Sequence, residues 1–455
     1  MQNRWNDEEA ADCRNDLELR VYTSRLLGQD PDLVLHGGGN TSVKITESNI
    51  FGEQEDILYV KGSGWDLATI EAEGFTPIRL DHLKKLATLQ ELSDLDMVNE
   101  MKTHQTNALS PAGSVEAILH AVLPFKFVDH THADAIVTIT NTPDGEQRIN
   151  EVFGDEVIII PYVMPGFDLA RLVAENFSKQ ATDKTVGMVL MNHGLFSFAD
   201  SAKESYELMI HLVQKAEDYL KANKAWDLPD ETLDYEPGFS RDVIAELRKD
   251  LSSKANSRFL LNVNFNDQAI AFARQKDVGQ TSQRGPATPD HVIRTKRLPM
   301  LGRDIEAYTS AYKDYFNRHA ADSRTPVSML DTVPRVILDH EMGFVTVGKS
   351  AKECQIIKDI YEHTMQIIQR AELLDQWQAL PEKDIFEVEY WSLEQAKLKK
   401  PGKSPEFLGE VVLITGAASG IGKACVESFM QEGAAVVGLD LDHSVTSLFP
   451  SQNYL

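Results

Sequence analysis

Three histidines with a characteristic spacing are the residues of this chain best suited to chemistry. One residue separates His130 from His132, and His193 follows an apolar run further along the chain. On a β-strand, alternate side chains face the same way, so an H-x-H pair directs both imidazoles to one side of the sheet. A third histidine can complete a three-nitrogen site with one coordination position open, as a catalytic Zn²⁺ requires. The spacing predicts a metal site made of His130, His132 and His193.

One carboxylate and two glycine-rich turns precede the histidines. Glu116 stands near the start of an expected helix capped by Ser114, and His120 follows Glu116 by one helical turn. The glycine-rich turns occupy residues 36–42 and 60–65. Glycines there let backbone N–H groups approach an oxyanion or a phosphate closely. Each of these signals is common alone. The two glycine-rich turns, the Glu116 segment and the histidines together, in this order, favour an active site.

That order of motifs resembles the class II aldolase/adducin family over about residues 16–223. The resemblance implies that Glu116 is the catalytic acid/base and that the three histidines bind Zn²⁺. It also implies a site for the substrate phosphate, made of Asn40, Thr41, Ser63, Gly64 and Ser114. The family often has two serines before the glutamate, but Val115 takes the second place here, so the phosphate site is less strongly implied than the metal site.

The expected reaction is the cleavage of a ketose 1-phosphate, similar to rhamnulose 1-phosphate, into dihydroxyacetone phosphate and a hydroxyaldehyde. Breaking a carbon–carbon bond beside a ketone builds up an enediolate charge, which a divalent metal stabilises as a Lewis acid. A carboxylate such as Glu116 must then move protons between oxygen and carbon. His120 either positions Glu116 or packs in the core. Imidazole ligands also suit Mn²⁺, Co²⁺ and Fe²⁺.

Two other functions use the same scaffold. One is a pentulose-phosphate epimerase, which would break and re-form the bond at the same metal site. The other is a non-catalytic, adducin-like assembly module. The presence of Glu116 with all three histidines argues against the module, because a scaffold does not need an open metal site.

Composition restricts the class of protein further. The chain has 455 residues, which predicts two or three domains, and a formal net charge of −25, which argues against nucleic acid as a partner. Cys13, Cys354 and Cys425 lack metal-binding spacing and are expected to be reduced. No apolar stretch is long enough to span a membrane. We therefore expect a soluble, cytoplasmic protein that binds a small sugar phosphate and no membrane, and the resemblance implies a homo-oligomer.

The expected elements mix helices with strands, which predicts an α/β layered fold. Helices are expected over residues 16–27, 81–92, 169–180 and 201–224, and strands over 42–45, 57–60, 127–129, 135–139, 157–160 and 186–191. The resemblance makes this a three-layer α/β/α domain with a mainly antiparallel sheet, covering residues 1–224.

Residues 225–398 are interpreted as a degenerate repeat of that domain. The sequence from Gly343 to Glu353 matches the sequence from Gly194 onward, an offset of 149 positions, at which His193 falls on Met342. Residues 289–293 would then correspond to 133–137, which leaves no counterpart for the H-x-H pair. The copy is expected to bind no metal, with His291 and His340 in structural roles. A coincidental likeness of two strand–helix segments is the alternative.

Residues 399–408 are interpreted as a linker and 409–455 as the start of a nucleotide-binding unit. A strand over 411–414, a glycine-rich turn, a helix over 423–432 and a strand over 435–439 follow the order of a Rossmann β-α-β unit. This resembles the opening of a short-chain dehydrogenase. The resemblance implies that NAD would contact Gly416, Ser419, Gly420, Ile421, Gly422 and Asp440.

The later strands and the Tyr-x-x-x-Lys pair of short-chain dehydrogenases do not follow in residues 443–455. We therefore expect an incomplete Rossmann unit without hydride chemistry, in a truncated form of a bifunctional aldolase/short-chain dehydrogenase. An NAD-binding regulatory protein is the remaining alternative.

Overall fold

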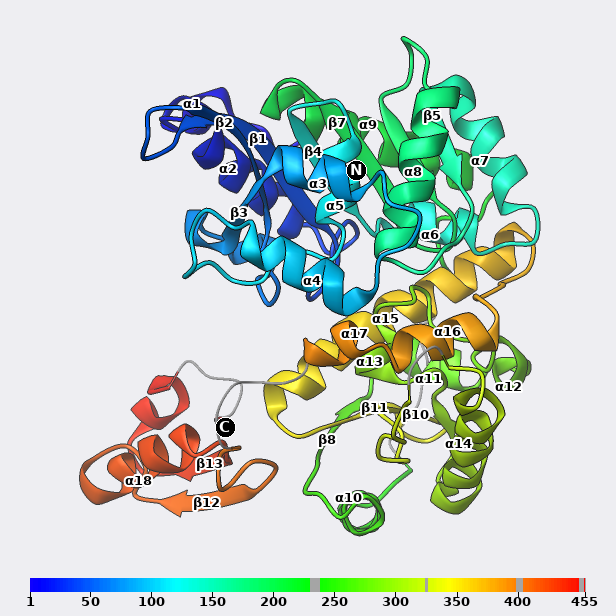
Figure 1. Ribbon diagram of the computed structural model, residues 1–455. Helices are drawn as coiled ribbons and strands as arrows, with labels where there is room; N and C mark the ends of the chain where they lie inside the picture. Colours follow the sequence, from blue (N-terminus) through cyan, green and yellow to red (C-terminus); the bar gives the residue numbers. More distant parts are fainter. Residues whose placement is uncertain (230–237, 324–325, 398–403, 450–453, 455) are drawn as a thin grey trace.

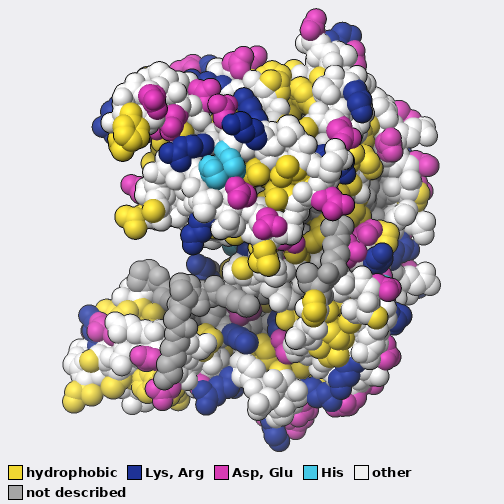
Figure 2. All heavy atoms as spheres, in the orientation of Figure 1, with side chains coloured by type: hydrophobic (Ala, Val, Ile, Leu, Met, Phe, Trp, Pro, Cys, Tyr) yellow, Lys and Arg dark blue, Asp and Glu magenta, His cyan; other side chains and the backbone are white. Residues whose placement is uncertain are grey.

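Three separate β-sheets follow one another along the chain in the computed structural model, which describes residues 1–229, 238–323, 326–397, 404–449 and 454 (Figure 1). We name the residues around these sheets the first unit (1–229), the second unit (238–397) and the third unit (404–449). Acidic and basic side chains are interspersed over the face shown in Figure 2. The described residues include no helix long and apolar enough to cross a membrane.

The first unit is built on a seven-stranded sheet of order β3-β2-β1-β4-β7-β6-β5. Every neighbouring pair is antiparallel except β5 and β6, as expected for a mainly antiparallel sheet. Its strands are β1 (Asn40–Ser48), β2 (Gln54–Lys61), β3 (Phe75–Arg79), β4 (Phe127–Thr131), β5 (Val157–Ile160), β6 (Gly187–Leu190) and β7 (Gly194–Ala199).

Helices cover both faces of this sheet and enclose two apolar cores, so the unit has three layers (Figure 1). One face carries α2 (Asp16–Gly28), α6 (Asp134–Thr140), α7 (Gly145–Phe153) and α9 (Ala202–Ala222). The other carries α3 (Leu80–Leu86), α4 (Asp94–Thr103), α5 (Ala117–Val122) and α8 (Phe167–Gln180). The remaining short elements are α1 (Asp7–Ala11), η1 (Leu67–Thr69), η2 (Ala72–Gly74) and η3 (Gly154–Glu156).

Two expected elements differ from the structure. The predicted strand over 135–139 was wrong, because these residues lie in α6, all seven residues of which are buried. A helix buried all round has no polar face and is hard to distinguish from a buried strand by sequence pattern. The predicted helix over 81–92 ends early at Leu86, since Leu80, Leu83 and Leu86 reach the core whereas Leu89 is 40% exposed.

The second unit is a four-stranded sheet of order β8-β11-β10-β9 with helices around it. Its strands are β8 (Leu260–Asn264), β9 (Met300–Leu301), β10 (Val336–Asp339) and β11 (Gly343–Gly348). Its helices are α10 (Arg241–Ala255), α11 (Asp267–Ala273), α12 (Val278–Thr281), α13 (Val292–Thr295), α14 (Ile305–Ala320), α15 (Ala351–Leu374), α16 (Glu382–Glu389) and α17 (Ser392–Ala396).

The sheet of the second unit resembles half of the first sheet. The order β8-β11-β10-β9 has the same pairing directions as β4-β7-β6-β5, two antiparallel pairs followed by one parallel pair. The bounds of β10, β11 and the start of α15 lie 149 positions after those of β6, β7 and α9. The expected match of 289–293 with 133–137 was wrong, because β8 takes the place of β4. Val263, Phe265 and Met342 then stand where the first unit has His130, His132 and His193.

The third unit consists of β12 (Val411–Thr415), α18 (Gly420–Gln431) and β13 (Ala435–Leu439), followed by η4 (His443–Ser447). The two strands are parallel, so this is a β-α-β unit. Val411, Leu413 and Leu439 remain about half or more exposed, and Figure 2 shows yellow apolar atoms on this unit, at the lower left. A two-stranded sheet with one helix leaves much of its apolar surface uncovered.

A buried ion pair beneath β4 fixes the strand that carries the H-x-H pair. Arg20 on α2 bonds to the carboxylate of Asp129, and Ser205 on α9 donates to the same carboxylate at 2.5 Å. Both charged side chains are fully buried. Because Asp129 faces these helices, the alternation along β4 directs His130 to the opposite face, toward α5.

Asp129→Asn should destabilise the protein by about 3–5 kcal/mol, because it leaves the Arg20 guanidinium buried without its counter-charge. Chemical denaturation of the two proteins measures the difference. The exposed pair of Lys184 and Asp155 is the control, since Asp155→Asn should change stability far less. Equal effects of the two substitutions would contradict a special role for the buried pair.

The second unit covers α6 of the first unit through α15 (Figure 1). His363 on α15 bonds to Asp134 at the start of α6, with Nδ1 and Oδ2 2.6 Å apart. His36 bonds to Asp359 on α15 at 2.7 Å, and Trp391 donates to Asp94 at 2.6 Å. These three polar contacts are among those that join the two units.

The pair of His363 and Asp134 should make the stability of this boundary depend on pH. Burial disfavours the imidazolium, but Asp134 and Asp32 outweigh it and raise the pKa of His363. The stabilisation is therefore complete below the ordinary histidine pKa of about 6.5 and is lost as pH rises through the raised pKa. Melting temperatures of the wild type and His363→Gln between pH 6 and 9 should converge with rising pH. A constant difference would contradict this assignment.

Candidate metal centre

The three histidines lie at the ends of neighbouring strands in the interior of the sheet. His130 lies in β4, His132 directly follows this strand, and His193 lies in the turn between β6 and β7. Gly194 after the turn has to be glycine, because a Cβ there would lie 2.3 Å from the carbonyl oxygen of Thr131 and 3.0 Å from the His130 ring. This close approach brings the turn against the H-x-H pair.

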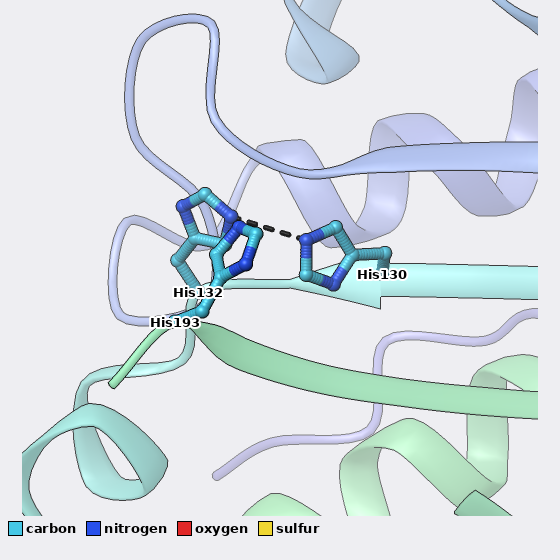
Figure 3. A group of neighbouring side chains, drawn as sticks. All are labelled: His130, His132 and His193. Atoms are coloured by element: carbon cyan, nitrogen blue, oxygen red, sulfur yellow. Dashed lines mark hydrogen bonds between the residues drawn. The ribbon is translucent and has the colours of Figure 1, made fainter. Parts of the chain in front are cut away.

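The imidazoles of His130, His132 and His193 face one another (Figure 3). One ring nitrogen from each lies within 4.8 Å of the others, and Nε2 of His132 is 3.2 Å from Nε2 of His130. All three residues are buried. Burial lowers the pKa of His130 and of His193 to about 4 and lowers the pKa of His132 well below its usual value. All three rings are therefore neutral near pH 7, the form that binds metals.

The orientation of the His130 ring is set by the backbone. Its Nδ1 lies 3.1 Å from the carbonyl oxygen of Leu195, so Nδ1 carries the proton and Nε2 has the free lone pair. The ring also stacks on Phe196, with centroids 4.1 Å apart. Three neutral, buried imidazoles with converging nitrogens fit a divalent cation of the zinc type.

Glu116 lies beside this group and is linked to His120 through Asn40. Asn40 donates from Nδ2 to Oε2 of Glu116 at 2.5 Å, and its Oδ1 bonds to Nε2 of His120. Oε2 of Glu116 lies 3.7 Å from Nε2 of His130, whereas the buried Oε1 has no hydrogen-bond partner among the described residues. Helix α5 begins at Ala117, so Glu116 is at its N-cap, one residue outside the helix. His120 thus contacts Asn40 and not Glu116, and one oxygen of Glu116 stays free of any described partner.

The residues expected to bind a phosphate are only partly brought together. Ser114 accepts from Asn40 at 3.3 Å, and a backbone bridge pairs Gly113 with Gly62, next to Ser63 and the exposed Gly64. Thr41 points to the other face of β1, where its buried hydroxyl bonds to Ser24 at 2.8 Å. The side chain of Thr41 therefore does not join the others.

Several residues that sequence reasoning did not select lie at the same site. Lys61 is buried and donates to the carbonyl oxygen of Gly39 at 3.1 Å, and burial lowers its pKa to about 8. From the second unit, Asp290 approaches His132 with 3.6 Å between Oδ2 and Nδ1. The His291 and His132 ring centroids are 6.2 Å apart. The only sequence signal for this loop was the P-D-H segment itself. His340, which was also expected to be structural, is exposed.

The glycine-rich turn of the third unit is shaped as expected for a tight strand-to-helix turn. Gly416 and Gly420 have positive φ, and a Cβ on Gly422 would lie 1.9 Å from the carbonyl oxygen of Gly416. Asp440 accepts from the backbone N–H of Ala418 at 2.9 Å, which ties the end of β13 to this turn. Ser419 is the N-cap of α18, and Ile421 is 86% exposed.

Comparison with known proteins identifies related chains for both large units. The class II aldolase and adducin N-terminal domain matches residues 18–220, and the second domain of class II aldolase matches residues 239–398. An uncharacterized oxidoreductase, YuxG of Bacillus subtilis, is 32% identical over 96% of this chain. The chain spans 66% of the length of that relative.

Two solved structures also match part of this chain. The N-terminal class II aldolase domain of a conserved Thermoplasma acidophilum protein is 44% identical, with 48% of this chain and 99% of that chain covered and a TM-score of 0.45. The L-fuculose-1-phosphate aldolase of Thermus thermophilus is 17% identical, with coverages of 47% and 99% and a TM-score of 0.29. With two models of one family matched in succession and a relative along nearly the whole chain, this protein belongs to the class II aldolase and adducin family.

Proposed function

We propose that the chain is a zinc-dependent lyase that cleaves a ketose 1-phosphate of the rhamnulose 1-phosphate type into dihydroxyacetone phosphate and a hydroxyaldehyde. The observation that carries the proposal is the buried group of His130, His132 and His193 with Glu116 3.7 Å from one of its rings. Bound there, a divalent cation would supply Lewis-acid stabilisation for the enediolate charge. The acid/base group stands beside the point where that charge develops.

Glu116 moves the proton in this reaction. Its free Oε1 accepts the proton from the hydroxyl whose carbon becomes the aldehyde, the carbon–carbon bond breaks, and its electron pair passes to the ketone side. Glu116 then returns the proton to the carbon that lost its neighbour, so no net proton is consumed. Asn40 holds the other carboxylate oxygen at 2.5 Å and keeps the group oriented between the two transfers.

The substrate phosphate would bind at the polar end of the site. Asn40, Ser63, Gly64 and Ser114 remain the proposed binding residues, and Thr41 could contribute through its backbone only, because its hydroxyl bonds to Ser24. Lys61 adds a buried cation close to Gly39, where its charge would complement a phosphate.

We further propose that the third unit belongs to an oxidoreductase part that binds NAD. The turn with Gly416, Ser419, Gly420, Ile421 and Gly422, and Asp440 after β13, support a pyrophosphate and ribose site. The proposed boundaries are 1–224 for the metal domain, 225–398 for the repeat, 399–408 for the linker and 409–455 for this part; residues 230–237 and 398–403 lie outside the described residues. A homo-oligomer is likewise proposed from the family.

The test is the release of dihydroxyacetone phosphate from rhamnulose 1-phosphate and from fuculose 1-phosphate by the purified chain, with its zinc content measured in parallel. Near-stoichiometric zinc and cleavage of either sugar support the proposal. Interconversion of pentulose phosphates without cleavage would identify an epimerase, and a metal-free, inactive protein would identify an assembly module.

A further inference from the structure

A loop of the second unit brings a carboxylate to the histidine group of the first unit. Asp290 and His291 stand between α12 and α13, and Asn141 at the end of α6 anchors the loop by donating to the carbonyl oxygen of Ala287 at 3.3 Å. Asn192, the neighbour of His193, donates to Oδ1 of the same Asn141 at 2.8 Å. The loop and the turn that carries His193 are therefore held by one residue.

Both side chains of this contact, Asp290 and His132, have a buried polar atom without a hydrogen bond to any described residue. Oδ2 of Asp290 lies 3.6 Å from Nδ1 of His132, and among the described residues neither that nitrogen nor Oδ1 of Asp290 has a hydrogen bond, although both are buried. Unpaired polar atoms in a protein interior are costly, and a buried carboxylate more so. Oε1 of Glu116 and Nε2 of His291 are also buried without partners within the described part of the chain. These unpaired groups, from both units, surround one polar site.

The two nitrogens of His132 point in different directions. Nε2 faces His130, and Nδ1 faces Asp290 (Figure 3 shows the first of these contacts as a dashed line). A neutral imidazole that gives its Nε2 lone pair to a cation must carry its proton on Nδ1. That proton would then point at the carboxylate of Asp290. Carboxylate–histidine–metal arrangements of this kind fix the ring and make it a stronger ligand.

We propose that Asp290 of the second unit is the positioning residue of the metal centre, accepting the Nδ1–H of His132 so that Nε2 is held toward the cation. The inference rests on the proposed metal function of the first unit. It gives the repeat a role: the copy has lost the histidines at its own equivalent positions and supplies instead a carboxylate to the site of its neighbour.

The experiment measures Zn²⁺ dissociation constants of the full chain by competition with a chromophoric chelator. In Asp290→Asn and Asp290→Ala we expect the constant to rise about 10- to 100-fold, more for alanine. The matched control is Asp359→Asn, which removes a carboxylate of the second unit that contacts His36 of the first unit, and it should leave the constant unchanged. Melting of the metal-free variants shows whether each is folded.

The outcomes separate this inference from the function it rests on. If wild-type binding does not depend on His130, the metal function fails and the inference fails with it. If wild-type Zn²⁺ binding depends on His130 but Asp290→Asn and Asp290→Ala bind Zn²⁺ as tightly as the wild type, only the inference is wrong. If these variants then show a raised KM for the sugar phosphate and nothing else, Asp290 contacts the substrate instead. If Asp290→Asn loses binding while His193→Ala retains it, Asp290 is a ligand, which also overturns the positioning role.

Discussion

Replacing His130 with alanine should remove both the bound zinc and the aldol cleavage. Two imidazoles remain in the variant, and without the third the site loses the ligand whose ring is fixed by Leu195. Lewis-acid stabilisation contributes several kcal/mol, so the rate should fall by about a thousand-fold or more. Metal analysis after gel filtration and the rate of dihydroxyacetone phosphate release measure the two effects.

His340→Ala is the matched control for this substitution. His340 is an exposed histidine of the second unit, outside the buried group, so metal content and rate should match the wild type. A His130→Ala variant that keeps stoichiometric zinc would place the metal elsewhere, for example at the surface group of His82, Glu100 and His104. Retained cleavage without metal would reject a metal-dependent mechanism.

The convergence of His130, His132 and His193 could be predicted from the sequence, because it depends on the strand period and one strand pairing. The H-x-H pair lies at the end of β4, and His193 lies in the turn before β7. The strand period and the pairing of β4 with β7 are enough to bring these histidines together. Glu116 became a candidate only through the family resemblance, because a glutamate near a helix start is usually a solvated residue. The link from Glu116 to His120 through Asn40 required the pairing of β1 with β4.

The approach of Asp290 to His132 could not be predicted, because it depends on how two distant segments dock. The P-D-H segment that contains Asp290 does not indicate which residues it contacts, and His132 lies 158 positions before it along the chain. The same docking explains the wrong strand over 135–139. Helix α6 is buried on every side because α9 covers one side and α15 of the second unit covers another. The lack of an exposed face in α6 reflects its packing against α15, which local sequence patterns do not identify.

The repeat also shows what sequence likeness can and cannot locate. The match from Gly343 onward found β11 and α15 correctly, since strand, N-cap serine and helix occur in the same order as in β7 and α9. It misplaced the counterpart of the H-x-H pair, because β8 has neither histidine and shares no motif with β4. Val263 and Met342, at two of the three histidine positions, belong to or pack on an apolar core.

Glu116→Gln should abolish proton transfer while leaving the metal in place. Glutamine has nearly the same shape and can still accept the hydrogen bond from Asn40, but it cannot take up a proton at the free oxygen. We expect kcat for aldol cleavage to fall by about 10²–10⁴-fold with zinc content unchanged. The exposed Glu73→Gln variant, with the same chemical change on the surface, should keep the wild-type rate.

The zinc content of Glu116→Gln distinguishes two roles of this carboxylate. Because Oε2 lies 3.7 Å from Nε2 of His130, Glu116 is close enough to become a fourth ligand through a small rotation of its side chain. A ligand role requires that zinc affinity falls together with the rate. A proton-transfer role requires that affinity is retained and the rate alone falls. A variant that keeps both zinc and rate would show that another group carries the proton, and the hydrogen bond from Asn40 would then serve only to satisfy a buried carboxylate.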